Sequence, residues 1–156
     1  MDVDVSTDDS RGLIGIDSDT IGNKTFVFLY FTESSSSSDG GKPLGNRLYR
    51  YELATDDNDS LINPKLLLDL PAGPGSKDNG GPVLIGPDNN VYLSIGHVSG
   101  DNDESHNTKA QNFETGPDAD GTSGIHRVTQ DGEIITPRNL EFNRFLGYLL
   151  CLWNKE

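Results

Sequence analysis

The sequence predicts an all-β fold built from short antiparallel strands. The chain has 156 residues, of which 18 are glycine and 8 are proline, and only 33% are hydrophobic. Its apolar runs are short, and clusters of Gly, Pro, Asn, Asp and Ser separate them, with no run of helical period. Such spacing is typical of a β-sandwich, a β-barrel or propeller blades, and at four strands per blade the chain has about two blades.

Eight short strands are expected. The strongest signal lies at residues 25–32, which are aromatic and β-branched nearly throughout, as in a strand that is buried on both faces. Residues 46–53 alternate, so that Arg47, Tyr49 and Tyr51 share one face. The predicted strands cover residues 13–16, 25–32, 46–53, 64–70, 83–85, 91–95, 124–129 and 133–136.

The clearest hairpin lies at residues 77–96. Gly80 and Gly81 precede its first strand and allow a positive φ or a close approach to another group. Residues 86–90 then combine Gly, Pro, Asp and two Asn, all of which favour turns. A second hairpin is expected at residues 124–136, around a turn at residues 130–132.

The remaining segments are predicted to be irregular. Residues 1–11 form an acidic, extended lead-in, and residues 33–45 form a flexible surface loop that contains five consecutive serines. Residues 56–63 form an acidic turn region, and residues 98–123 form a long polar loop. Loops of that length are functional or disordered in most proteins.

Charge and composition exclude several partners. The formal net charge is −13, and such a surface repels phosphate backbones, so we expect no nucleic-acid partner. No window of about 18 apolar residues is present, so no membrane span is expected. The acidic start does not resemble a signal peptide, and the sequence does not indicate a cellular compartment. The single cysteine, Cys151, excludes an internal disulfide, and the acidity favours either solubility or cation binding.

The motif at residues 80–96, GGPVLIGPDNNVYLSIG, resembles a segment of the glucose/sorbosone dehydrogenase family. Further similar segments follow the same order, so the resemblance covers about residues 10–148. It implies a six-bladed β-propeller that uses pyrroloquinoline quinone (PQQ) to oxidise a sugar, with family members often exported. The additional segments are residues 12–16, 46–53, 66–71, 110–112 and 124–132.

The resemblance divides the chain into a lead-in at residues 1–11, a partial propeller domain at residues 12–148 and a divergent tail at residues 149–156. A closed propeller needs further blades, so the expected fold is a set of antiparallel four-stranded blades of a partial six-bladed propeller, with the missing blades as partners. Relatives continue after Tyr148 with a Gly-x-Arg-Asn run, which this chain lacks. A frame change, an early stop or a divergent last strand would produce that difference.

The resemblance also assigns candidate site residues. Asp78 stands where the family has its proton-accepting histidine, and His97 stands where relatives commonly have aspartate. An aspartate with its ordinary pKa of about 4 is a poorer base at neutral pH than a histidine. Asp78 and His97 are the predicted catalytic residues, which would exchange roles across the hairpin, and an ordinary loop carboxylate is the alternative for Asp78. Asn79 and Gln111 are the predicted cofactor contacts. His106 and His126 are expected to be exposed or packed.

Calcium is the predicted metal. Oxygen-bearing side chains alternate in two acidic segments of the long polar loop, as hard cations prefer. The candidate ligands are Asp101, Asp103, Asp118 and Asp120. Zinc is not expected, because neither His-x-x-x-His nor Cys-x-x-Cys spacing occurs.

Three functions follow. The first is PQQ-dependent oxidation of the anomeric hydroxyl of an aldose, with this chain inactive alone because the histidine is replaced and later cofactor contacts are missing. The second is a non-catalytic propeller module that binds carbohydrate or protein. The third is a truncated gene product without independent function.

Overall fold

The computed structural model describes residues 3–36, 39–55, 60–73, 75–98 and 121–135. These ranges contain seven strands and no helix, which confirms the all-β prediction. Accordingly, none of them contains a helix long and apolar enough to cross a membrane. The strands are β1 (Leu13–Ile21), β2 (Lys24–Ser34), β3 (Pro43–Leu53), β4 (Leu61–Leu70), β5 (Val83–Ile85), β6 (Val91–Ile95) and β7 (Gly124–Val128).

The strands form two antiparallel sheets in which each strand pairs with the next one along the chain. Sheet A has the order β1-β2-β3-β4, and sheet B has the order β5-β6-β7. Beside β7, an isolated bridge joins Val128 and Ile134. In the same segment Ile135 N donates a hydrogen bond of 3.0 Å to Arg127 O. The predicted second hairpin has its turn and first strand, but among the described residues its second strand, predicted at 133–136, is reduced to the bridge at Ile134. Both sheets follow one meander topology.

Strand pairing moves several predicted boundaries. The hairpin strands at residues 83–85 and 91–95 are confirmed without change. β1 extends beyond residue 16 to Ile21, because its polar second half stays paired with β2 as far as the two-residue turn at residues 22–23. The predicted acidic turn at residues 56–63 is wrong at its end, since residues 61–63 belong to β4 and pair with β3.

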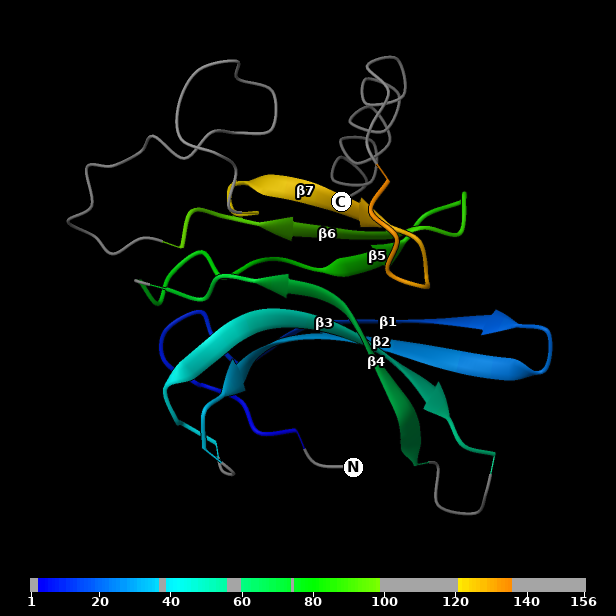
Figure 1. The fold of residues 1–156 in the computed structure, drawn as a ribbon, viewed down its shortest axis with the longest axis horizontal. Helices are drawn as coiled ribbons and strands as arrows, with labels where there is room; N and C mark the ends of the chain where they lie inside the picture. The colour runs from blue at the N-terminus through cyan, green and yellow to red at the C-terminus, as the bar shows by residue number, and fades with distance from the viewer. Residues whose placement is uncertain (1–2, 37–38, 56–59, 74, 99–120, 136–156) are drawn as a thin grey trace, which may run out of the picture.

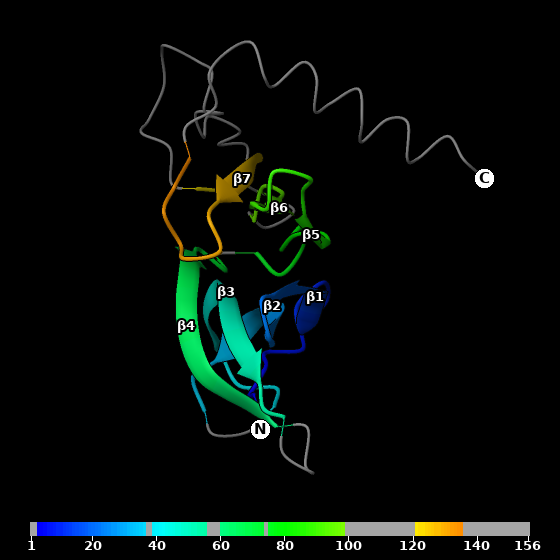
Figure 2. The same cartoon turned by 90° about the vertical axis from the view of Figure 1, so that its right-hand side faces the viewer.

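The two sheets stack face to face (Figure 1). Strands β1 to β4 run in one layer and β5 to β7 in the other, with β1 next to β5 (Figure 2). At this edge Asp17 Oδ2 accepts a hydrogen bond of 2.8 Å from Ile85 N. Gly15 lies so close to β5 that an added Cβ would be 2.9 Å from Val83 N. A glycine in β1 therefore sets the distance between the two sheets.

Apolar side chains from both sheets fill the space between them. The even-numbered residues of β2 point inward, and Phe28 and Tyr30 are completely buried. Sheet B contributes the alternate residues of its short strands. The buried members of this core are Phe28, Tyr30, Leu48, Leu67, Leu68, Leu70, Val83, Val91, Leu93, Ile95, Val98 and Val128.

The odd-numbered residues of β2 and β3 form the outer face of sheet A. The Phe31 and Tyr49 rings stack with centroids 5.6 Å apart, and the Tyr49 and Tyr51 rings follow at 5.9 Å. Residues 28–32 of β2 are buried without a break, which confirms the prediction of burial on both faces. The predicted face with Arg47, Tyr49 and Tyr51 is also confirmed.

A polar contact joins the sheets at the edge away from β1 and β5. Arg50 Nη1 on β3 donates to Gln130 O at 2.8 Å and to Asp131 Oδ1 at 3.0 Å. Lys65 on β4 donates to the same Asp131 oxygen at 2.9 Å. The Arg50 guanidinium also lies 4.6 Å from the centre of the Phe26 ring. These contacts hold the turn after β7 against sheet A.

Asp88 organises the turn between β5 and β6. Its carboxylate accepts hydrogen bonds from the Asn90 side chain at 2.8 Å, from the Tyr92 hydroxyl at 2.8 Å and from Arg127 on β7. Burial acts to raise the pKa of Asp88, but these donors outweigh it and lower the pKa to about 2. Asn89 completes the turn with a φ of 59°.

We expect Gly15→Ala to destabilise the protein by about 1–3 kcal/mol, because the new Cβ would meet the backbone of Val83. Gly73→Ala is the matched control, since no heavy atom lies within 4 Å of its added Cβ. Urea unfolding followed by circular dichroism measures both free energies of unfolding. Equal free energies for the two variants would contradict the close approach of β1 and β5.

Asp88→Asn should lower stability at neutral pH by about 1–2 kcal/mol, after a reduction for solvent screening. The folded-state pKa of Asp88, about 2, lies below the ordinary aspartate pKa of 3.8, so the contribution of the carboxylate is complete above pH 4. It is lost as pH falls from about 4 to about 2. Tyr92→Phe removes one of the hydrogen-bond donors to Asp88 and should therefore cause part of the same loss of stability. The test is the free energy of unfolding from pH 2 to pH 7, and a difference independent of pH would refute the assignment.

Candidate functional site

The predicted pair Asp78 and His97 lies at one end of the two stacked sheets, where four segments meet. We call this the loop end and define it as residues 8–12, 72–81, 96–98 and 121–124. Backbone hydrogen bonds connect the segments: Ser10 N donates to Ser76 O at 3.2 Å, and Gly75 N donates to Val98 O at 2.8 Å. Ser123 N donates to Gly96 O at 3.0 Å.

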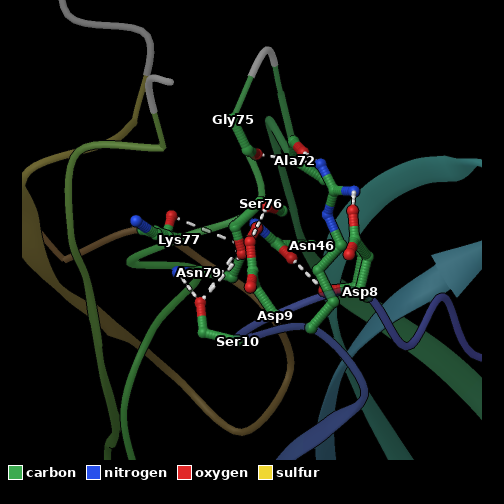
Figure 3. A network of polar contacts seen from close by, with 11 residues as sticks. Asp8, Asp9, Ser10, Asn46, Ala72, Gly75, Ser76, Lys77 and Asn79 are labelled. Atoms are coloured by element: carbon green, nitrogen blue, oxygen red, sulfur yellow. Dashed lines mark hydrogen bonds and ion pairs between the residues drawn. The ribbon is translucent and has the colours of Figure 1, made fainter. Parts of the chain in front are cut away.

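Asn79 lies at the centre of the loop end and is completely buried (Figure 3). Its side-chain nitrogen donates to Ser76 O at 2.6 Å, and its side-chain oxygen accepts from Asn46 Nδ2 at 2.9 Å. Its carbonyl oxygen accepts from the Tyr30 hydroxyl at 2.7 Å. These contacts satisfy the buried amide within the chain. They account for the burial of Asn79 without a ligand, and its predicted contact with a cofactor stays a prediction.

The network continues into sheet A through Asn46. Its side chain donates to Pro71 O at 2.8 Å and accepts from the Thr32 hydroxyl at 2.6 Å. Thr32 and Asn46 are both completely buried on the inner face. Burial also raises the pKa of the Tyr30 hydroxyl, so the hydroxyl stays protonated and remains a donor to Asn79. The loop end is therefore anchored in the middle of the sheet.

Arg11 holds the loop after β4 from the lead-in side. Its Nη2 donates to Ala72 O at 2.7 Å and to Gly75 O at 2.8 Å, and its Nη1 lies 3.7 Å from Asp8. The Arg11 side chain is 8% exposed, and its Nε is buried without a hydrogen-bond partner among the described residues. The acidic lead-in is thus part of the folded structure, in contact with both β2 and the loop end.

The structure brings Asp78 next to the residue that precedes His97. Asp78 O accepts a hydrogen bond of 3.0 Å from Gly96 N. A Cβ added to Gly96 would lie 2.7 Å from the Asp78 Cβ, so only glycine fits there. Asp78 is exposed and has a φ of 59°, a left-handed conformation that Asp, Asn and His adopt more readily than other residues with a side chain. His97 is half-buried.

The two glycines after Asn79 behave as the sequence predicts. Gly80 has a φ of 136°, and its added Cβ would lie 2.5 Å from Tyr30 Cε1. An added Cβ on Gly81 would lie 2.6 Å from Ser94 Oγ. The close contacts keep the Asp78 backbone against β6, and they explain why both positions need glycine.

The remaining predicted residues are five site candidates and two histidines. Gln111 and the four calcium candidates, Asp101, Asp103, Asp118 and Asp120, lie outside the described residues, as does His106. His126 is buried on the inner face of sheet B, where its Nε2 lies 2.6 Å from Gly121 O, so it is packed as expected. Within residues that the structure describes, no three His, Cys, Asp or Glu side chains gather as metal ligands.

Sequence reasoning missed the residues that shape the loop end. Ser10 was assigned to the lead-in, and Arg11, Tyr30 and Asn46 were given no role in the site. One signal was available for Asn46, because an amide on the inner face of an apolar strand must find partners when it is buried. No comparable pattern marks Ser10 or Arg11, whose partners in the loop after β4 lie more than 60 residues away.

No protein-family model matches this chain, and a search of curated proteins finds no match. The chemistry of the loop end therefore comes from its own residues. It places a carboxylate beside a histidine-bearing segment, which can accept or relay a proton. It also has the exposed Lys77, which is suited to an anionic oxygen, near the buried Arg11, whose Nε has no hydrogen-bond partner within the described part of the chain.

Asn79→Ala should lower the free energy of unfolding by roughly 2–3 kcal/mol, because the change removes the hydrogen bonds that the buried Asn79 amide makes with Asn46 and Ser76. Asn23→Ala, in the exposed turn after β1, is the matched control and should change it little. Chemical denaturation measures the free energy of unfolding of both variants. If the two variants unfold at the same denaturant concentration, the buried network does not stabilise the loop end.

Proposed function

We propose that this chain forms two blades of a six-bladed β-propeller of the glucose/sorbosone dehydrogenase type. Two consecutive antiparallel meanders stacked face to face support this proposal, because adjacent propeller blades have the same topology and packing. The proximity of β1 and β5, the first strands of the two sheets, also agrees, since first strands line the axis of a propeller. The proposed activity is quinone-dependent oxidation of an aldose at its anomeric hydroxyl.

The single observation that carries the activity is the hydrogen bond from Gly96 N to Asp78 O. It brings together the two segments that bear the acid–base candidates. Asp78 accepts the proton of the sugar hydroxyl in this proposal, and His97 shares or relays it. When bound, PQQ would accept the hydride. The chain's own residues bind and orient the sugar and hold the proton at the Asp78 carboxylate.

PQQ carries carboxylates, and the exposed Lys77, which precedes Asp78 in the chain, is a cation of the loop end that such an anion can reach. Arg11 is buried and donates to Ala72 O and Gly75 O, so its role in this proposal is to hold the loop that leads to Lys77. We propose Lys77 as the group that holds the quinone, and Asn79 as a positioning residue that fixes the Asp78 backbone. A carboxylate in place of the family's histidine predicts a weak base and little turnover by this chain.

The test is reconstitution of the full chain with PQQ, calcium and glucose, with equilibrium dialysis for binding and dye reduction for turnover. We expect PQQ binding with little turnover, and about a tenfold gain in dye reduction for Asp78→His. Asp78→Asn is the matched control, because Asp, Asn and His all tolerate the φ of 59° at this position. Absence of PQQ binding in every variant would refute the proposal.

The second candidate is a non-catalytic module of the same fold that binds carbohydrate. The replacement of the histidine by Asp78 favours it, since binding does not need a base. Glucose or oligosaccharide binding by calorimetry, without dye reduction in wild type or in Asp78→His, would support this candidate over the enzyme.

A further inference from the structure

Asn79 and Gly80 form an Asn-Gly pair, and the sequence contains no other pair of this kind. Asparagine is among the thermolabile side chains. It is most labile before glycine, because no Cβ hinders the backbone nitrogen of the glycine. The residue at the centre of the buried network is therefore also the one whose side chain has the greatest intrinsic tendency to lose its amide.

The reaction is an attack within the chain itself. The Gly80 nitrogen bonds to the side-chain carbonyl carbon of Asn79, the bond from that carbon to Nδ2 breaks, and ammonia leaves with the proton of the Gly80 amide. Water then opens the resulting succinimide at either of its two carbonyl groups, which gives aspartate or isoaspartate. One water molecule is consumed and one ammonia molecule is released, and nothing is oxidised or reduced.

The folded loop end holds both reacting groups in place. The Asn79 side chain is completely buried, with its nitrogen bonded to Ser76 O and its oxygen to Asn46 Nδ2 (Figure 3). Gly80 is packed so closely that an added Cβ would lie 2.5 Å from Tyr30 Cε1. The amide and the Gly80 nitrogen therefore cannot turn toward each other, and bulk water does not reach them while the loop end is closed.

The product of the reaction does not fit the same position. Asn79 Nδ2 donates to Ser76 O at 2.6 Å and to Lys77 O at 3.3 Å, and both acceptors are carbonyl oxygens. A carboxylate oxygen in place of Nδ2 would face two acceptors without a proton to share, which is unfavourable for a buried charge. Isoaspartate also lengthens the main chain by one carbon atom directly before the packed Gly80. Both products therefore oppose closure of the loop end at neutral pH.

We propose that Asn79 is a deamidation site that the closed loop end protects and that reacts when the loop end opens. Local opening releases the amide and the Gly80 nitrogen without unfolding the rest of the chain. Deamidation then blocks closure, so the arrangement that holds Asp78 O on Gly96 N is lost permanently. The proposal depends only on the buried network and is independent of the proposed function.

The test is peptide mapping by mass spectrometry of the full chain, incubated in mildly alkaline buffer with and without urea. In urea we expect Asn79 to deamidate faster than any other asparagine. Without urea we expect its deamidation to be at least about tenfold slower. Equal rates for Asn79 in the two conditions, or faster deamidation of another asparagine in urea, would overturn the proposal.

Tyr30→Phe separates the opening of the loop end from the chemistry. The change removes the hydroxyl that donates to Asn79 O at 2.7 Å and keeps the ring that packs on Gly80. It should speed deamidation of the folded protein several-fold and leave the rate in urea unchanged. Tyr92→Phe is the matched control, because it removes a hydroxyl bonded to Asp88 in the turn at the opposite end of the β5–β6 hairpin. A folded-state rate in Tyr30→Phe equal to that in Tyr92→Phe would refute the role of the loop end.

Asn79→Asp reproduces one product directly. Hydrogen exchange at the Gly81 and Gly96 amides, which bond to Ser94 O and Asp78 O, should be at least about tenfold faster than in the wild type at neutral pH, with the amides of β2 still protected. Asn23→Asp adds the same charge in the exposed turn after β1 and is the matched control. Exchange in Asn79→Asp as slow as in this control would show that deamidation does not block closure.

Discussion

The burial of a single amide, that of Asn79, constrains the whole loop end. A primary amide placed in an apolar interior needs partners for both its oxygen and its nitrogen. The partners come from β3, through Asn46, and from the loop after β4, through Ser76. Ser10 connects the lead-in to the same network, because its hydroxyl oxygen accepts a hydrogen bond from the Asn79 side chain. The position of Asp78 follows from this network, because its neighbour in the chain cannot move without losing several buried hydrogen bonds.

A second constraint acts between the sheets, and it comes from glycine. At Gly15 the backbone of β1 touches the backbone of β5, whereas the other edge is held by the long Arg50 side chain. At this other edge the turn after β7 also lies close to β4, since a Cβ added to Gly132 would lie 3.3 Å from Leu67 Cα. Glycines at both edges therefore keep the two sheets in close contact, and the Arg50 side chain adds a polar contact at the second edge.

The sequence predicted the fold class and most strands because the relevant signals are local. Alternation in residues 46–53 and the turn at residues 86–90 depend only on neighbouring residues. The end of β1 and the start of β4 were misplaced because polar strands are held by their partners, which the local pattern does not contain. The loop end was predicted only through Asp78, Asn79 and His97. Its remaining contacts join residues far apart in the sequence, such as Arg11 with Ala72.

The backbone conformation at position 78 is compatible with side chains of different chemistry. Asp78 has a left-handed backbone conformation. Aspartate, asparagine and histidine adopt this conformation more readily than other residues that have a side chain. An exchange between histidine and aspartate is therefore neutral for the turn, and the buried Asn79 continues to hold it. Replacement of a base at this position changes proton affinity and leaves the loop intact. In the proposed site, the same scaffold can therefore carry either a histidine that accepts the proton or a carboxylate that only binds.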